Sequence, residues 1–131
     1  MKKFLAFVAA PLLVLLTACG GNASAQINNL SADEFASNIQ NPATVILDVR
    51  TAGEYAAGHI EGAINIDVES ANFDTKIANL DKNVEYSIYC HSGRRSGIAA
   101  QKMADAGFTK LTNLKDGIIS WQSAGYPLVV S

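Results

Sequence analysis

Short apolar runs alternate with segments of helical composition through most of this chain, and the alternation limits the folds open to it. Residues 45–49 form an almost continuous apolar run, which is typical of a strand that a parallel sheet buries on both faces. Gly, Asn, Asp and Pro residues separate such runs from the helical segments around them. The pattern therefore predicts an α/β fold in which helices cover both faces of a mostly parallel sheet.

The same signals place the individual elements. Ser31 stands three residues before Glu34, which is the spacing of a capping box, and predicts the start of a first helix. Further helices are predicted over residues 51–57, within 70–80, over 96–106 and over 118–124. Strands are predicted over residues 45–49, 62–67, 84–89 and 111–114. Because ligands bind beyond the carboxyl ends of the strands in such folds, the loops at that edge are expected to form the site.

The first residues have the pattern of an export signal. A basic start precedes an apolar run over residues 4–16, which is shorter than the roughly 20 residues that a membrane-spanning helix needs. Residues 16–20 read Leu-Thr-Ala-Cys-Gly and resemble the lipobox of bacterial lipoproteins. This resemblance implies cleavage before Cys19 and a lipid anchor on Cys19. A secretory signal that is cut near residues 23–25 is the alternative.

These signals predict three segments: a lipoprotein signal peptide at residues 1–18, a lipidated cysteine and flexible tether at 19–26, and one domain at 27–131. The last segment has about 105 residues, which is enough for one compact core and too few for two domains. We therefore expect an exported protein that is lipid-anchored in the cell envelope and faces the periplasm or the cell exterior.

Charge and composition exclude several partners. The chain has 10 Lys and Arg against 12 Asp and Glu, and removal of the two lysines of the predicted signal peptide leaves 8 against 12, a net charge of −4. An acidic domain of this kind is unsuited to nucleic acid or to an anionic lipid surface, so the lipid anchor is the one membrane contact expected. The sequence has no metal-ligand spacing and no phosphate-binding glycine motif, so neither a metal nor a cofactor is expected. No self-association patch is evident, and a monomer is expected.

Cys90 ends one predicted strand, and the next residues turn into a helix. The unpaired N–H groups of a helix N-terminus, together with the helix dipole, stabilise an anion or a thiolate placed there. The chain has two cysteines, so lipidation of Cys19 would leave Cys90 as the free thiol. The position predicts nucleophilic sulfur chemistry on an anion. The alternatives are a buried, inert cysteine and, where Cys19 escapes lipidation, a disulfide between the two.

Three motifs, in order, give the chain a resemblance to single-domain rhodaneses. They are Asp48-Val49-Arg50 with Glu54-Tyr55 and residues 58–66 (Gly-His-Ile-Glu-Gly-Ala-Ile-Asn-Ile), Cys90-x-x-Gly93-x-Arg95-Ser96, and Leu114-x-x-Gly117-x-x-x-Trp121. The resemblance implies a three-layer fold with a central, mostly parallel, five-stranded sheet. It also implies a sulfurtransferase, in which Cys90 takes sulfane sulfur from thiosulfate or a related donor as a persulfide and passes it to a thiol or cyanide acceptor.

The resemblance also implies a substrate cradle in the loop after the cysteine. Its members are His91, Ser92, Gly93, Arg94, Arg95 and Ser96, whose backbone N–H groups would surround the persulfide and the donor. We expect Arg94 to attract the donor anion, with a merely solvated side chain as the alternative. Arg95 is expected to brace the loop toward a carboxylate. His91 is interpreted as a loop surface residue that tunes the choice of acceptor.

Structural support is expected from three residues of the first motif. Asp48 is expected to fix loop hydrogen bonds, and Arg50 to pair with Glu54 four positions on. His59, between Gly58 and Ile60, is expected to bond to backbone rather than to act as a catalytic imidazole.

Two other functions stay open. Phosphatases and arsenate reductases of the same fold close their loop with Cys-x5-Arg, whereas Arg95 here follows Cys90 after four residues, and this shorter loop favours sulfur over a phosphoryl group. The second is a non-catalytic or partner-dependent module that binds or delivers sulfur only when docked to another protein, because a fold does not fix a function.

Overall fold

The computed structural model of the chain describes residues 26–131. The predicted signal peptide, the predicted lipid site at Cys19 and the tether up to residue 25 lie outside the described residues. Gln26 was assigned to the tether but begins the first strand, where it pairs with Lys110. Among the helices that the structure describes, none is both long and apolar enough to cross a membrane.

Five strands form one sheet in the order β1-β5-β4-β2-β3, and all four pairings are parallel. The strands are β1 (Gln26–Leu30), β2 (Val45–Asp48), β3 (Ile64–Asn65), β4 (Tyr86–Tyr89) and β5 (Lys110–Leu114). The buried central strands β2 and β4 carry apolar residues on both faces, as a doubly covered parallel sheet requires. The predicted α/β fold with a parallel five-stranded sheet is confirmed, and Cys90 directly follows the central strand β4 at its carboxyl end.

Five helices connect the strands: α1 (Ala32–Asn38), α2 (Ala52–Ala57), α3 (Phe73–Ala78), α4 (Arg94–Asp105) and α5 (Gly117–Ser123). The cap predicted at Ser31 is present, since its side chain accepts a hydrogen bond from the Glu34 N–H at 3.2 Å. A full capping box joins Thr51 and Glu54 at the start of α2. Helix α4 begins two residues earlier than predicted because Gly93, in the left-handed conformation, turns the chain directly into it.

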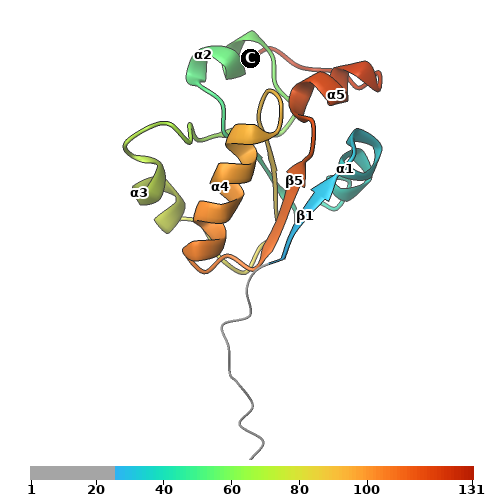
Figure 1. Cartoon of the computed structure of the whole chain (residues 1–131). Helices are drawn as coiled ribbons and strands as arrows, with labels where there is room; N and C mark the ends of the chain where they lie inside the picture. Colours follow the sequence, from blue (N-terminus) through green and yellow to red (C-terminus); the bar gives the residue numbers. More distant parts are fainter. Residues whose placement is uncertain (1–25) are drawn as a thin grey trace, which may run out of the picture.

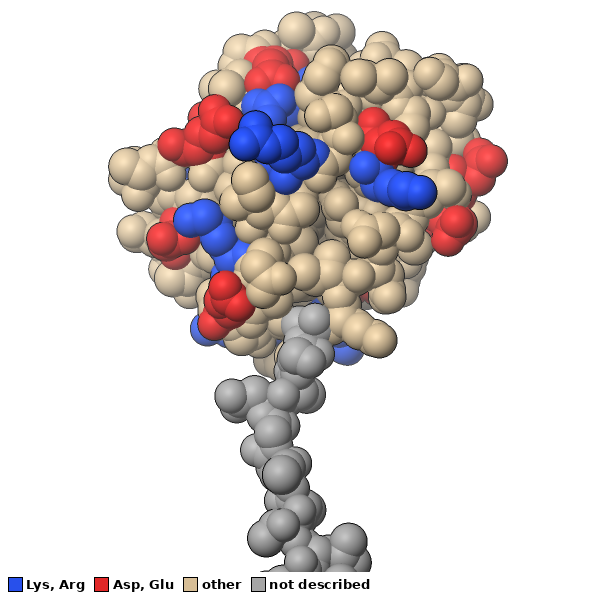
Figure 2. All heavy atoms as spheres, in the orientation of Figure 1, with Lys and Arg blue, Asp and Glu red and all other residues tan. Residues whose placement is uncertain are grey.

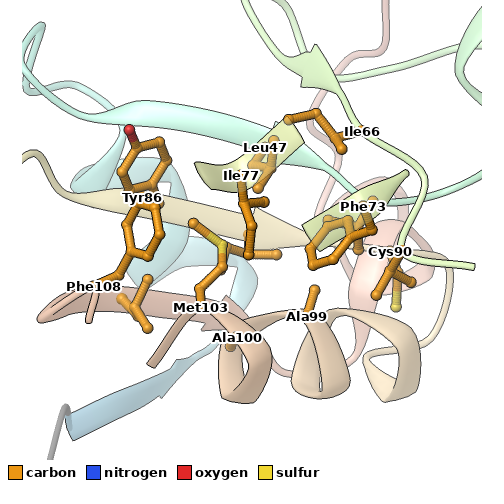
Figure 3. Packing of buried hydrophobic residues seen from close by; sticks show 14 residues of the cluster. Leu47, Ile66, Phe73, Ile77, Tyr86, Cys90, Ala99, Ala100, Met103 and Phe108 are labelled. Carbon is orange, nitrogen blue, oxygen red and sulfur yellow. The ribbon is translucent and has the colours of Figure 1, made fainter. Parts of the chain in front are cut away.

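Helices lie on both faces of the sheet and make three layers (Figure 1), which two hydrophobic clusters, one on each face, hold together. Helices α3 and α4 cover one face, and Phe73, Ile77 and Met103 of these helices belong to one cluster with Leu47 of β2 (Figure 3). Helices α1 and α5 cover the other face through residues such as Phe35 and Trp121, whose rings meet edge to face at 6.1 Å. Full burial of one large apolar side chain stabilises a fold by about 1.5–3 kcal/mol. The buried side chains on each face therefore hold the helices firmly against the sheet.

Two strands differ from their prediction. Strand β1 was not predicted, because Gln26–Leu30 is mostly polar and forms an exposed edge, but it pairs with β5 residue by residue. The strand expected over residues 62–67 is reduced to Ile64–Asn65 at the opposite edge, beside β2. Short or polar edge strands are the usual way in which a sheet avoids pairing with another chain.

Candidate active site

Cys90 is fully buried at the carboxyl end of β4. It lies at one end of the hydrophobic cluster between the sheet and helices α3 and α4, next to Phe73 (Figure 3). Its Sγ accepts a hydrogen bond from the Gly93 N–H at 3.0 Å and contacts the Ser96 Oγ at 3.3 Å. The Ser96 Oγ also lies 3.2 Å from the Gly93 carbonyl oxygen. A hydroxyl has one proton, so this group can donate to Sγ when the sulfur is charged and to the carbonyl when it is not. The loop thus places two hydrogen-bond donors at the sulfur.

The loop after Cys90 depends on a glycine at its fourth position. Gly93 has a φ of +101°, a backbone conformation that side chains rarely adopt, and a Cβ there would overlap the carbonyl oxygen of Lys115. The turn therefore brings the Gly93 N–H to the sulfur and starts α4 in the same step.

Helix α5 holds the other side of the loop. Its N–H groups at Ile118 and Ile119 donate to the carbonyl oxygens of Cys90 at 2.9 Å and His91 at 3.3 Å. Gly117, with φ of +64°, lies against the same peptide, where any Cβ would overlap the His91 carbonyl. These contacts between segments far apart in the sequence occupy the first two carbonyl groups of the loop, so its shape is fixed on both sides.

Arg95 reaches a carboxylate, as expected, and its partner is Glu54 of α2. Two hydrogen bonds of 2.7 and 2.9 Å join the guanidinium to the two carboxylate oxygens. The hydrogen bonds from Arg95 lower the pKa of Glu54 from 4.5 to about 2, and the bonds to Glu54 raise the pKa of Arg95. The Arg95 side chain is therefore bound within the protein, whereas Arg94 is exposed and makes no ion pair among the described residues.

Arg50 does not pair with Glu54, and that prediction was wrong. Its guanidinium binds Asp48, with Nη2 at 2.7 Å from Oδ2, and donates to the carbonyl oxygen of Gly58 at 2.6 Å. Both charged side chains are buried. Burial alone would lower the pKa of Arg50, but the hydrogen bonds and charge of Asp48 raise it above its usual value. Asp48 also accepts the Arg50 backbone N–H at 2.9 Å, which agrees with its expected use in fixing loop hydrogen bonds.

His59 and Tyr89 complete this network beneath α2. The His59 ring stacks on Tyr55 at 3.7 Å, and its Nδ1 lies 2.9 Å from the Tyr55 carbonyl oxygen, so the histidine bonds to backbone as expected. The Tyr89 hydroxyl accepts the Ile60 N–H at 3.0 Å, and burial raises the pKa of Tyr89, which keeps it neutral. Among the described residues, the hydrogen-bond partners of the Cys90 sulfur are Gly93 and Ser96. The arrangement is that of a thiol held by a loop and contains no acid–histidine–thiol relay.

Basic side chains gather over the N-terminal end of α4, with acidic side chains on both sides of them (Figure 2). In residues 26–131 no group of three or more His, Cys, Asp or Glu side chains is arranged to hold a metal ion. Of the predicted loop residues, Gly93 and Ser96 contact the Cys90 sulfur, and the sequence did not predict that Glu54 and Gly117 contact the loop. Gly117 is part of the third motif, and that motif is the sequence signal that could have assigned it to the site.

The ion pair makes acid stability a measurable property of the site. A lowered pKa for Glu54 means that the stabilisation is complete above about pH 4.5 and is lost as pH falls toward 2. We expect the difference in free energy of unfolding between the wild type and Glu54→Gln to shrink over this range, as measured by urea denaturation at a series of pH values. Glu34→Gln, which changes the matching capping residue of α1, is the control. A difference that stays constant from pH 6 to pH 2 would contradict the assignment.

Comparison with known proteins gives a consistent answer. Residues 31–124 match the rhodanese-like domain family. The chain is 37% identical over 101 residues to the protein YrkF of Bacillus subtilis, an alignment that takes in 76% of this chain and 53% of YrkF, so the chain spans about half the length of that relative. It is 34% identical over 99 residues to the thiosulfate sulfurtransferase GlpE of Pseudomonas fluorescens, covering 75% of this chain and 87% of GlpE.

Two further similarities cover nearly the whole length of the protein that is compared. A sulfurtransferase of Allochromatium vinosum is 29% identical over 104 residues, covering 79% of this chain and 95% of that protein. The crystal structure of a rhodanese-related protein from Thermoplasma volcanium superposes with a TM-score of 0.70 at 30% identity, over 79% of this chain and 99% of the other. Fold, loop and relatives agree, and the chain belongs to the rhodanese-like domain family.

Proposed function

We propose that this protein is a sulfurtransferase that carries sulfane sulfur on Cys90, with thiosulfate or a related anion as donor. One observation carries the proposal: the Cys90 sulfur lies at the end of β4, and the Gly93 N–H and the Ser96 hydroxyl bind it at the start of α4. The relatives named sulfurtransferase and thiosulfate sulfurtransferase support it.

The proposed reaction has two steps. The Cys90 thiolate attacks the outer sulfur of thiosulfate, a new S–S bond forms, the S–S bond of thiosulfate breaks, and sulfite leaves with the bonding electron pair. A thiolate or cyanide acceptor then attacks the outer sulfur of the persulfide, and the Cys90 thiolate leaves with the electrons of that bond. No net redox change and no cofactor is needed, because the sulfur moves at the same oxidation level.

The loop supports this chemistry through electrostatics. Negative charge rests on sulfur before the attack and on the persulfide after it, and the Gly93 N–H together with the helix N-terminus stabilises an anion at this place throughout. Because Cys90 is fully buried, a donor with a narrow terminal sulfur fits the approach better than a bulky disulfide.

The deciding experiment is intact-mass measurement of residues 26–131, fully reduced and folded, after incubation with thiosulfate. We expect a gain of one sulfur atom on Cys90 that a reductant removes. Absence of the adduct would exclude the sulfurtransferase. Hydrolysis of a chromogenic phosphate ester by the same sample, without uptake of sulfur, would favour the phosphatase instead.

Arg94 is the exposed cation of the loop and is proposed to attract the donor anion. We expect Arg94→Ala to raise the KM for thiosulfate about three- to tenfold with little change in kcat, because the side chain acts on the approach of the charge rather than on bond exchange. Steady-state thiocyanate formation measures both constants. A large loss of kcat at unchanged KM would show that Arg94 has another role.

We also propose that the protein is exported and held in the cell envelope by a lipid on Cys19, on the strength of the lipobox-like residues 16–20. Labelling of growing cells with a radioactive fatty acid should mark the wild type and leave Cys19→Ser unlabelled. Equal labelling of the two would exclude this site.

A further inference from the structure

The two adjacent arginines of the cysteine loop have different electrostatic states. Arg94 is exposed and makes no ion pair in the described part of the chain, whereas Arg95 is held by Glu54 through two hydrogen bonds of 2.7 and 2.9 Å. The pair is only partly exposed, with side-chain exposures of 20% for Arg95 and 33% for Glu54. Arg95 directly precedes Ser96, whose Oγ contacts the Cys90 sulfur at 3.3 Å, so Arg95 belongs to the stretch that surrounds the sulfur. Arg95 is thus close enough to influence a charged donor, but its charge is offset.

Glu54 is held in place from its own side of the contact. Its Oε1 accepts hydrogen bonds from the Thr51 hydroxyl at 3.2 Å and the Thr51 N–H at 3.4 Å, as the capping box of α2. The other end of α2 is tied down where Arg50 donates to the Gly58 carbonyl. Glu54 therefore cannot follow Arg95 if that side chain turns toward a ligand, and the ion pair opposes such a turn.

The backbone of the loop does not rely on this ion pair. Helix α5 holds the carbonyls of Cys90 and His91, and Gly93 is seated against Lys115. Loss of the pair would leave these main-chain contacts in place. Glu54 therefore affects the charge of the site more than its shape.

We infer that Glu54 is a specificity-determining residue of the site: by neutralising Arg95 it weakens the preference for doubly charged thiosulfate relative to singly charged sulfur donors. The inference rests on the proposed sulfurtransferase function and deepens it. With Glu54 in place, the loop has one free cationic side chain, Arg94, which suits a donor with one charge. Without Glu54 it would have two.

Two donors of matched chemistry test this inference. Thiosulfate carries two negative charges and releases sulfite, whereas methanethiosulfonate carries one and releases methanesulfinate, and each gives the same Cys90 persulfide. The measured quantity is the ratio of kcat/KM for thiosulfate to that for methanethiosulfonate, with cyanide as acceptor. Any change in the reactivity of the thiolate affects both donors and cancels in the ratio.

The expected shifts have opposite signs. Glu54→Gln should raise the ratio by about threefold or more, and Arg95→Gln, which leaves the Glu54 charge unbalanced, should lower it by a similar factor. The double variant should return close to the wild type. A purely structural role would move the ratio in the same direction in both single variants, because each removes the same two-point contact between guanidinium and carboxylate, and that result would overturn the inference.

Controls separate the inference from folding and from the proposed function. Glu34→Gln changes the same type of capping residue on α1 and should leave the ratio unchanged. Glutamine still suits the capping position of α2, and if Glu54→Gln fails to fold, a ratio in Arg95→Gln that is unchanged or raised contradicts the inference. A wild type that takes sulfur from neither donor disproves the sulfurtransferase itself. A wild type that uses both donors, with ratios indifferent to Glu54 and Arg95, disproves the specificity role alone.

Discussion

Replacement of Cys90 by serine is expected to abolish both sulfur uptake and thiocyanate formation while leaving the fold intact. An alcohol oxygen cannot form the persulfide, so the loss should be complete rather than partial. Serine retains the hydrogen bonds with the Gly93 N–H and the Ser96 hydroxyl, and it is slightly smaller than the cysteine that it replaces. The variant would therefore be unable to form the persulfide, while the shape of the site would be nearly unchanged.

Intact mass after thiosulfate treatment and thermal unfolding together measure this result. Cys90→Ala is the matched control, because it keeps an apolar side chain in the buried cluster but removes the hydrogen-bond acceptor. Both variants should lack the adduct, and both should unfold cooperatively. A sulfur adduct that persists in Cys90→Ser would place the sulfur on another group and would remove the basis of the mechanism.

Asp48→Ala is expected to destabilise the protein by about 3–5 kcal/mol, because it leaves the buried charge of Arg50 without its partner. The Asp48 side chain has no exposed surface and that of Arg50 is 6% exposed, so water cannot replace the lost contacts. Domains of this size are stable by about 5–15 kcal/mol in total, so the variant should be close to unfolding at physiological temperature.

Urea denaturation of the reduced domain measures this loss. Replacement of both partners, as Asp48→Leu with Arg50→Met, is the matched control and should cost much less than the single change, since no buried charge is left unpaired. The Gly58 carbonyl would lose its Arg50 donor in the double variant, whereas Asp48→Ala keeps that donor. A single variant within 1 kcal/mol of the wild type would show that Arg50 finds another partner or reaches solvent.

The fold was predictable from the sequence where local signals agree with the tertiary structure. The apolar residues of β2, the capping residue Ser31 and the position of Cys90 after β4 all follow from patterns within a few residues. Strand β1 has no such pattern, since Gln26–Leu30 is mostly polar. It is a strand because β5 offers it five backbone partners, and that information lies more than 80 residues away.

The cysteine loop could be recognised as one continuous stretch of sequence, but the residues that contact it from elsewhere in the chain could not. The pairing of Arg50 with Glu54 rested on their four-residue spacing, but Thr51 is the N-cap of α2, so Arg50 lies before the helix and the four-residue rule does not apply to it. Arg50 pairs instead with Asp48, two residues before it, whereas the pair of Arg95 with Glu54 joins residues 41 positions apart and depends on how the loop after β4 and the start of α2 meet. The contact of Gly117 with the loop is of the same long-range kind.

The contact between α5 and the cysteine loop also bears on how the protein is made. The N–H groups that hold the Cys90 and His91 carbonyls belong to Ile118 and Ile119, which follow the cysteine in the chain and are synthesised after it. A growing chain that has reached only α4 has the thiol but lacks the groups that fix the loop around it. Cys90 therefore gains its complete surroundings only when α5 docks, and a chain that stops before α5 would lack these contacts.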